Sequence, residues 1–289
     1  MLFAVAELLV HVQSGVRQGG VLFPLLFNFC INELICSLKN SDLGCHVRDV
    51  YIGCILSASV CMLQNMLDIC IGVSTFLYLS FNSSKSQCIA VGRNKFCNIP
   101  ELMLNDNALK WVTHLKYLRV SIVSSNSFSV CLDGTRLKYF AAANALNAHC
   151  KYISEPVKLQ MFESYCLPVL LYGIDCINLS KQQIHELTVC WNNAYRKIFG
   201  FKMSESVKTV IYFMQRIDFR KLYDLRHLMF MSKLRYLQRD VIVNLLPLSL
   251  TADDVNDLFC TYDVTMYSTQ CCIKTRVFSA FENCSVGSV

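Results

Sequence analysis

The spacing of apolar residues along the chain changes near residue 130. Before it, short apolar runs alternate with turn residues, and residues 45–56 are β-branched and alternating, which predicts strands. Helical spacing is confined there to residues 25–38 and 60–70. From about residue 131 the apolar positions recur at helical spacing. We therefore predict an α+β fold, with an antiparallel sheet and helices in residues 1–125 and helices alone in residues 126–240.

The clearest predicted helix lies between Ser180 and Gly200. Ser180 with Gln183 has the spacing of a capping box, and Gly200 suits the left-handed residue that ends a helix. Between them runs one apolar stripe at helical spacing, which comprises Ile184, Leu187, Trp191, Ala194, Tyr195 and Ile198. This stripe should face the core of the helical region.

Other helix boundaries follow from proline and serine. Residues 154–156 (Ser-Glu-Pro) form a start signal, and Pro168 should end or kink the helix that follows. We expect further helices to begin at Ser204 and to run from Asp218 to Arg239. Residues 241–289 should hold one more helix and then a tail, 260–289, that is rich in Ser, Thr and Cys and loosely ordered.

The composition is apolar for a globular chain. Hydrophobic residues make up 54% of the 289 residues and charged residues only 17%, whereas an average soluble domain has about 25% charged residues. Such a balance suits part of a larger assembly. We therefore expect a protein partner to cover some of the apolar surface.

The net charge of +6 is unevenly spread. Residues 1–130 hold nine Lys and Arg against seven Asp and Glu, residues 131–240 hold sixteen against nine, and residues 241–289 hold two against five. A basic middle section can follow a phosphate backbone by releasing its counterions. Solvated helix faces would produce the same excess, so charge alone leaves both interpretations open.

The seventeen cysteines predict free thiols. Their number is odd, no Cys-x-x-Cys occurs, and many lie within apolar runs, where cysteine behaves as a small hydrophobe. The adjacent Cys271 and Cys272 have no nearby histidine at zinc-ligand spacing, so we expect no metal–thiolate site. Met1–Val10 has no basic start and is interrupted by Glu7, unlike a secretory signal. We predict an intracellular protein that is not secreted.

A membrane span must be weighed for residues 50–67, which carry no charged residue and approach the length that crosses a bilayer. Ser57, Ser59, Gln64 and Asn65 interrupt this stretch. We therefore predict no contact with a membrane.

The most informative stretch is 15–28, Gly-Val-Arg-Gln-Gly-Gly-Val-Leu-Phe-Pro-Leu-Leu-Phe-Asn. Gly19 and Gly20 lack the Cβ atom that would obstruct a ligand. Arg17 and Gln18 supply forked donors suited to phosphates or base edges. A glycine-rich turn before a core helix is the structural alternative.

This stretch resembles the R-Q-G motif of reverse transcriptases of non-LTR (LINE-like) retrotransposons. Residues 81–86 resemble the next motif of that family, a turn with a lysine, and residues 115–120 resemble its L-K-Y-L-G-V strand. The chain departs from the family at Phe23, where a small serine is usual, and at Arg119, where glycine is usual. The resemblance spans about residues 15–240.

The resemblance implies a partial reverse-transcriptase palm in residues 1–125, a helical thumb and post-thumb region in 126–240, and a C-terminal segment in 241–289. The family activity is RNA-directed DNA polymerisation with Mg²⁺. The implied partners are RNA or an RNA–DNA duplex. The residues implied to bind nucleic acid or nucleotide are Arg17, Gln18, Gly19, Gly20 and Lys85, the last near the nucleotide phosphates.

The catalytic hairpin of the family is missing. After a strand like residues 51–55 the family continues into Tyr-Ala-Asp-Asp, whereas here Ile55 and Leu56 run directly into residues 57–60. Two-metal nucleotidyl transfer needs carboxylates that hold both ions. The first aspartate motif is also absent, and Met1 is interpreted as a truncation. Asp49 and Asp68 remain, but neither is expected at a hairpin tip. We predict no catalytic residues, no metal and no cofactor.

Residues 251–254, Thr-Ala-Asp-Asp, resemble the missing Tyr-Ala-Asp-Asp sequence. Val255, Leu258 and Phe259 follow at helical spacing, and Thr251 suits an N-cap with acids in the first turn. We therefore predict a capped helix here.

Two functions remain open: an inactive polymerase remnant that retains nucleic-acid affinity, and a non-enzymatic module co-opted for contact with protein or RNA.

Overall fold

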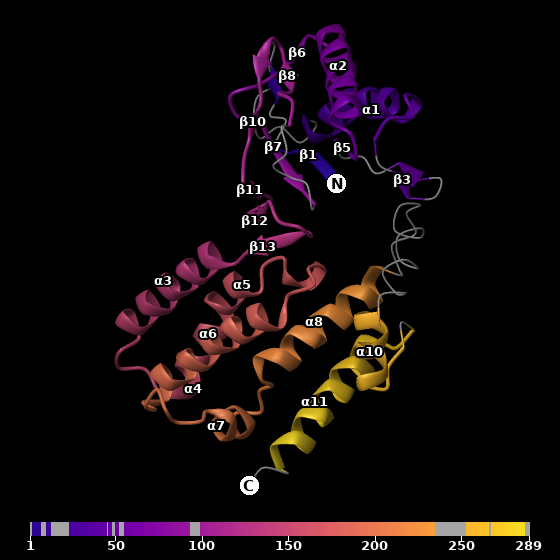
Figure 1. Ribbon diagram of the computed structural model, residues 1–289. Helices are drawn as coiled ribbons and strands as arrows, with labels where there is room; N and C mark the ends of the chain where they lie inside the picture. The colour runs from indigo at the N-terminus through magenta and orange to yellow at the C-terminus, as the bar shows by residue number, and fades with distance from the viewer. Residues whose placement is uncertain are drawn as a thin grey trace. The chain divides into compact units, whose positions relative to one another are not determined.

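The computed structural model describes residues 2–6, 10–12, 23–44, 46–47, 50–51, 55–92, 99–234, 253–265 and 267–286 (Figure 1). The chain divides into two compact units, Met1–Cys131 and Leu132–Val289. The first unit contains strands and helices, and the described part of the second is helical, so the fold is α+β. The division falls six residues later than the predicted boundary, because the last strand of the first unit reaches Cys131.

The main sheet of the first unit has the strand order β10-β7-β1-β5. β1 (Leu2–Ala6) lies between β5 (Leu56–Ser57) and β7 (Gln87–Val91) and is antiparallel to both. β10 (Lys110–Trp111) pairs with β7 in parallel. The sheet is therefore mostly antiparallel, as predicted, with one parallel edge strand.

Two helices supply the core of this unit. α1 (Phe23–Asn40) and α2 (Val60–Phe76) pack on each other, and α2 also contacts β1 and β5. Buried residues of α2 recur at the spacing of one helix face, which confirms the predicted helix. The core formed around this face comprises Leu38, Ile55, Leu63, Met66, Leu67, Cys70, Phe81, Cys88, Ala90, Leu102, Leu104 and Leu109. Burial raises the pKa of the Cys70 and Cys88 thiols to about 12, so both act as apolar core residues.

Shorter strand pairs surround this core. β2 (Val10–Val12) pairs with β6 (Leu79–Phe81), and β3 (His46–Val47) pairs with β4 (Val50–Tyr51). The strands predicted in residues 45–56 are therefore present, but they are short.

A tight hairpin joins β8 (Met103–Leu104) to β9 (Asn107–Ala108). Asn105 and Asp106 form the turn, with left-handed φ of 49° and 60°. That pair of positive φ angles is typical of the turn that matches strand twist in a two-residue hairpin.

Residues 115–120, which resemble one strand of the family, do not form a single strand. β11 (His114–Tyr117) and β12 (Val120–Val123) are separate antiparallel strands, and β13 (Ser129–Cys131) pairs with β12. Leu118 and Arg119 form the turn between them with φ of 46° and 67°. Left-handed φ strains side-chain-bearing residues, so Arg119 occupies a position that glycine fits better.

The second unit is built from helices, and its described residues contain no strand. α3 (Asp133–His149), α4 (Glu155–Tyr165) and α6 (Lys181–Phe199) pack on one another. The short elements α5, η1 and α7 connect the longer helices; they span Leu167–Leu170, Ile174–Cys176 and Lys208–Phe213. The predicted helix from 154–156 ends at Tyr165, before Pro168, as expected for a helix near proline.

α6 confirms the sequence prediction in detail. Ser180 and Gln183 form a reciprocal capping box, and Gly200 ends the helix with φ of 73°. All six residues of the predicted stripe are buried. Trp191 and Tyr195 belong to an aromatic core with Tyr139, Phe162 and Phe219, whose neighbouring rings have centroids 5.2–6.5 Å apart.

α7 begins four residues after the predicted start at Ser204. Residues 203–205 form turns and Val207 precedes the first helical residue, so the serine does not cap the helix. Val207 and Ile211 are buried. α8 (Phe219–Leu234) is the described part of the helix predicted from Asp218 to Arg239.

The prediction of a loosely ordered tail is wrong for the described residues. α10 (Asp253–Thr261) is the predicted helix, but α11 (Gln270–Val286) lies within the supposed tail and packs along α8 (Figure 1). Burial of Ile273, Val277 and Phe281 along one face outweighs the polar composition. Residues 253–286 therefore belong to the helical unit.

Among the described helices none is both apolar enough and long enough to cross a bilayer.

Candidate functional site

Of the five residues predicted to bind nucleic acid or nucleotide, the structure describes only Lys85. Arg17, Gln18, Gly19 and Gly20 lie outside the described residues. Lys85 is exposed in the turn between β6 and β7. Its backbone N–H donates to the carbonyl oxygen of Asn82 at 3.2 Å, which closes the turn and leaves the side chain in solvent. The turn predicted for residues 81–86 is therefore present.

β5 passes almost directly into α2. Ser57 ends the strand, Ala58 and Ser59 make the bend, and the helix starts at Val60. The Ser57 side chain is buried, and its Oγ accepts the N–H of Ser59 at 3.2 Å. Among the described residues, β4 pairs with β3 and makes no pairing with β5.

Among the described residues, the carboxylate near this junction, Asp68, belongs to no metal-binding group. Asp68 is exposed on α2, where it accepts a hydrogen bond from Gln64 at 2.8 Å, and Asp49 lies outside the described residues. Asp253 and Asp254 are the first two residues of α10, as the capped-helix prediction requires. Across the part of the chain that the structure describes, no three His, Cys, Asp or Glu residues are grouped to hold an ion.

Three arginines of the basic middle section are committed to ion pairs. Arg136 Nη1 lies 3.1 Å from Glu186 Oε2, and the other two, Arg216 and Arg226, pair as described below. Exposed cations nevertheless remain in this section; they are Lys138, Lys151, Lys181, Lys197, Lys202, Lys208, Arg220 and Lys233. The ion pairs thus reduce the basic surface without removing it.

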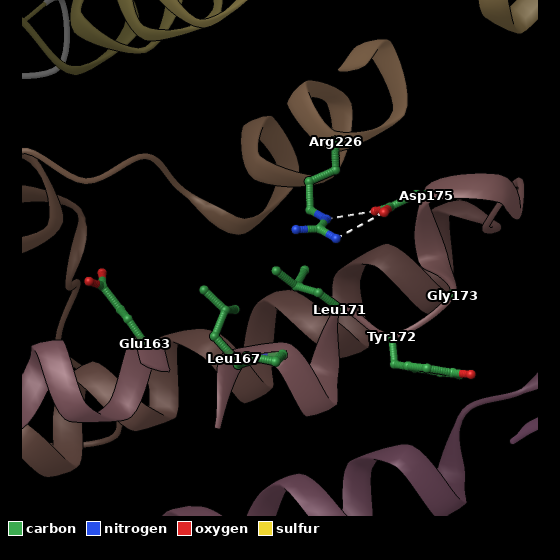
Figure 2. A pocket seen from close by; sticks show the side chains of 8 residues that line it. Glu163, Leu167, Leu171, Tyr172, Gly173, Asp175 and Arg226 are labelled. Atoms are coloured by element: carbon green, nitrogen blue, oxygen red, sulfur yellow. Dashed lines mark hydrogen bonds and ion pairs between the residues drawn. The ribbon is translucent and has the colours of Figure 1, made fainter. Parts of the chain in front are cut away.

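A pocket of about 420 Å³ lies between α4, α5, η1 and α8 (Figure 2). We call it the Arg226 pocket; its lining residues are Glu163, Leu167, Pro168, Leu171, Tyr172, Gly173, Asp175 and Arg226. Figure 2 shows Arg226 extending from α8 to Asp175 over the side chains of Leu167 and Leu171. The same view shows the Tyr172 ring directed away from Arg226.

The two acids that line the Arg226 pocket are both paired. Arg226 donates from Nε and Nη2 to Asp175 Oδ1 and Oδ2 at 2.6 and 2.9 Å, a bidentate arrangement. Arg216 donates from Nε to Glu163 Oε1 at 2.7 Å. Bidentate charge-assisted bonds fix orientation as well as distance. The charged walls are therefore neutralised and held in place.

Two further polar residues that are partly or fully buried, Asp224 and His227, lie on α8. The Tyr262 hydroxyl donates to Asp224 Oδ2 at 2.6 Å, which ties the segment before α11 to α8. Burial raises the pKa of Asp224, although the hydrogen bond from Tyr262 opposes this. His227 is buried one turn away, and burial lowers its pKa. Its Nδ1 has no hydrogen-bond partner among the described residues.

No sequence pattern marks the Arg226 pocket. Arg226 and Arg216 stand out in the sequence only as part of a basic stretch, and no motif singles out Glu163 or Asp175. The two ion pairs join residues 51 and 53 positions apart. No local spacing in the sequence reports a contact between elements so far apart along the chain.

No protein-family model matches the chain, and a search of curated proteins finds no match.

Proposed function

We propose that this chain is the remnant of a non-LTR retrotransposon reverse transcriptase, which binds RNA or an RNA–DNA duplex but does not polymerise DNA. The observation that carries the proposal is the junction between β5 and α2. Where the resembling family places a hairpin with two carboxylates, only Ala58 and Ser59 separate the strand from the helix.

The connectivity around this junction supports the palm interpretation. The chain passes from β1 through α1 to β5, and then through α2 to β7. β5, α2 and β7 thus form a split βαβ unit, in which β1 lies between the two parallel strands. Many unrelated proteins share that unit, so the fold is compatible with a palm and the three sequence motifs carry the family assignment.

The chemistry of the junction supports the absence of polymerase activity. Two metal ions about 3.5–4 Å apart would have to hold the attacking and leaving oxygens. In place of two carboxylates the chain has a buried serine, Ser57, which is a poor ligand for Mg²⁺ compared with aspartate. The residues at this position therefore do not fit the metal pair of the family.

Residual nucleic-acid binding is supported by charge. The exposed lysines of the helical unit and Lys85 in the palm-like unit leave donors available to phosphate oxygens. Phosphate contacts of this kind give affinity without sequence preference and weaken as salt rises.

A non-enzymatic protein-binding module is the second candidate. It is favoured by Phe76 and Tyr78, which are 77% and 83% exposed at the end of α2. Tyr78 also has a left-handed φ of 56°, which strains a tyrosine. Large exposed aromatic residues at a strained turn are typical of contact surfaces with proteins.

A salt titration tests nucleic-acid binding. Fluorescence anisotropy of a labelled RNA–DNA duplex should show affinity falling steeply between about 50 and 200 mM salt. The variant Lys85→Gln should reduce the slope of log affinity against log salt by about one, whereas the control Lys85→Arg should not. No binding at low salt, or affinity that is independent of salt, would contradict the proposal and favour the protein-binding module.

A further inference from the structure

We propose that the Arg226 pocket binds an unpaired base of single-stranded RNA. The inference rests on the proposed function and adds to it a subsite that reads a base rather than a phosphate. Its volume, about 420 Å³, lies in the range of small-molecule sites.

The charges of the pocket select an uncharged ligand. Asp175 neutralises Arg226 through both carboxylate oxygens, and Arg216 neutralises Glu163. A phosphate would meet two carboxylates and one guanidinium that is already paired. A cationic group would meet Arg226 directly. The lining therefore disfavours both charge signs.

One donor and an apolar floor remain for an uncharged ring. The pair with Asp175 uses Nε and Nη2 of Arg226, so Nη1 takes no part in it. Leu167 and Leu171 lie below it (Figure 2), and Pro168 also lines the pocket. A base has ring faces that pack on such a floor or on a guanidinium plane, and it has carbonyl or ring-nitrogen acceptors for Nη1.

The pocket is also held open. The Arg226–Asp175 pair joins α8 to η1, and the Arg216–Glu163 pair fixes the segment before α8 to α4. A ligand entering between these elements would not have to order them first, which reduces the cost of binding.

Filling the pocket tests the inference. The tryptophan of Leu167→Trp should fill the floor of the pocket without altering a charge. Val157→Trp, at a position of α4 that is 48% exposed, is the matched control. In anisotropy measurements with oligouridylate, Leu167→Trp should weaken binding by roughly five-fold or more, as loss of one stacked base does, with the salt slope unchanged. Binding of a fully paired RNA–DNA duplex should not change, because its bases are not free.

A second measurement needs no variant. Photo-crosslinking of the unaltered protein to oligouridylate containing 4-thiouridine should map to residues 163–175 or to Arg226. RNA binding that Leu167→Trp leaves unchanged, or crosslinks confined to other residues, would overturn the subsite while leaving the proposed function intact. Failure of the parent protein to bind any RNA would instead reject the proposed function, and the subsite with it.

Discussion

Ser57 lies opposite Phe3 in the antiparallel pairing of β5 with β1. The last residue of β5 thus pairs with the central strand of the sheet, and α2 starts three residues later. A hairpin that carried carboxylates beyond β5 would need additional residues at this junction. The pairing therefore locates the change that, in our proposal, separates this chain from an active polymerase.

Replacement of Arg119 by glycine should stabilise the first unit. Arg119 has φ of 67° in the exposed turn between β11 and β12. A left-handed residue with a Cβ costs about 1–2 kcal/mol, and the greater freedom of glycine in the unfolded chain offsets part of that gain. We expect a net gain of about 0.5–1 kcal/mol in the free energy of unfolding, measured by urea denaturation.

The control for this prediction is Lys116→Gly, in the neighbouring strand β11. Glycine there should destabilise the strand by about 0.5–1 kcal/mol. If Arg119→Gly destabilises the protein as Lys116→Gly does, the turn does not have the left-handed geometry described above.

Loss of the Tyr262 hydroxyl should loosen the C-terminal helices. Tyr262→Phe removes the 2.6 Å hydrogen bond to Asp224 and leaves a half-buried carboxylate without that donor. Hydrogen bonds to charged groups contribute about 1.5–3 kcal/mol, so thermal unfolding should occur at a lower temperature. Tyr165→Phe, at a tyrosine that is 69% exposed, is the control and should have no effect. Equal effects of the two variants would refute the assignment.

His227 should make stability fall as the pH is lowered. Because burial lowers its pKa below 6.5, the unfolded chain binds a proton at a pH where the native histidine does not. Stability is therefore present above about pH 6.5 and is lost as pH falls from there through the folded pKa. Asp224 acts oppositely, since its raised pKa favours the folded state at low pH and this contribution is lost as pH rises through that pKa.

The variant His227→Gln isolates the histidine contribution, because glutamine retains a donor and does not titrate. Urea denaturation at pH 7 and at pH 5.5 should show a smaller difference for the variant than for the parent. The charged groups that act on His227 are Asp224 on the same helix and Asp175 from η1. An unchanged pH dependence would assign the effect to other groups.

The sequence predicts the parts of the fold that depend on local signals. The α6 caps and stripe are recoverable because Ser180, Gln183 and Gly200 act within one helix. The turn at Leu118 and Arg119 is missed because neither residue is the glycine or asparagine that usually marks left-handed φ. For α11 a signal was present, since Ile273, Val277 and Phe281 recur every fourth residue, but the surrounding serines and cysteines obscured it.

The candidate site depends on contacts that local patterns do not encode. The Arg226 pocket requires α8 to lie against η1 and the segment before α8 to be tied to α4, and the sequence carries no periodic signal for that packing. The R-Q-G stretch was visible because it is contiguous, yet Arg17 and Gln18 lie outside the described residues. Their proposed role stays a prediction from the family resemblance.

Primer extension tests the central claim most directly. The purified protein, given an RNA template, an annealed DNA primer, labelled nucleotides and Mg²⁺ or Mn²⁺, should incorporate no label above background while still binding the duplex at low salt. The double variant Asp253→Ala, Asp254→Ala should behave as the parent does, because both residues begin helix α10. Incorporation by the parent that the double variant loses would contradict the account.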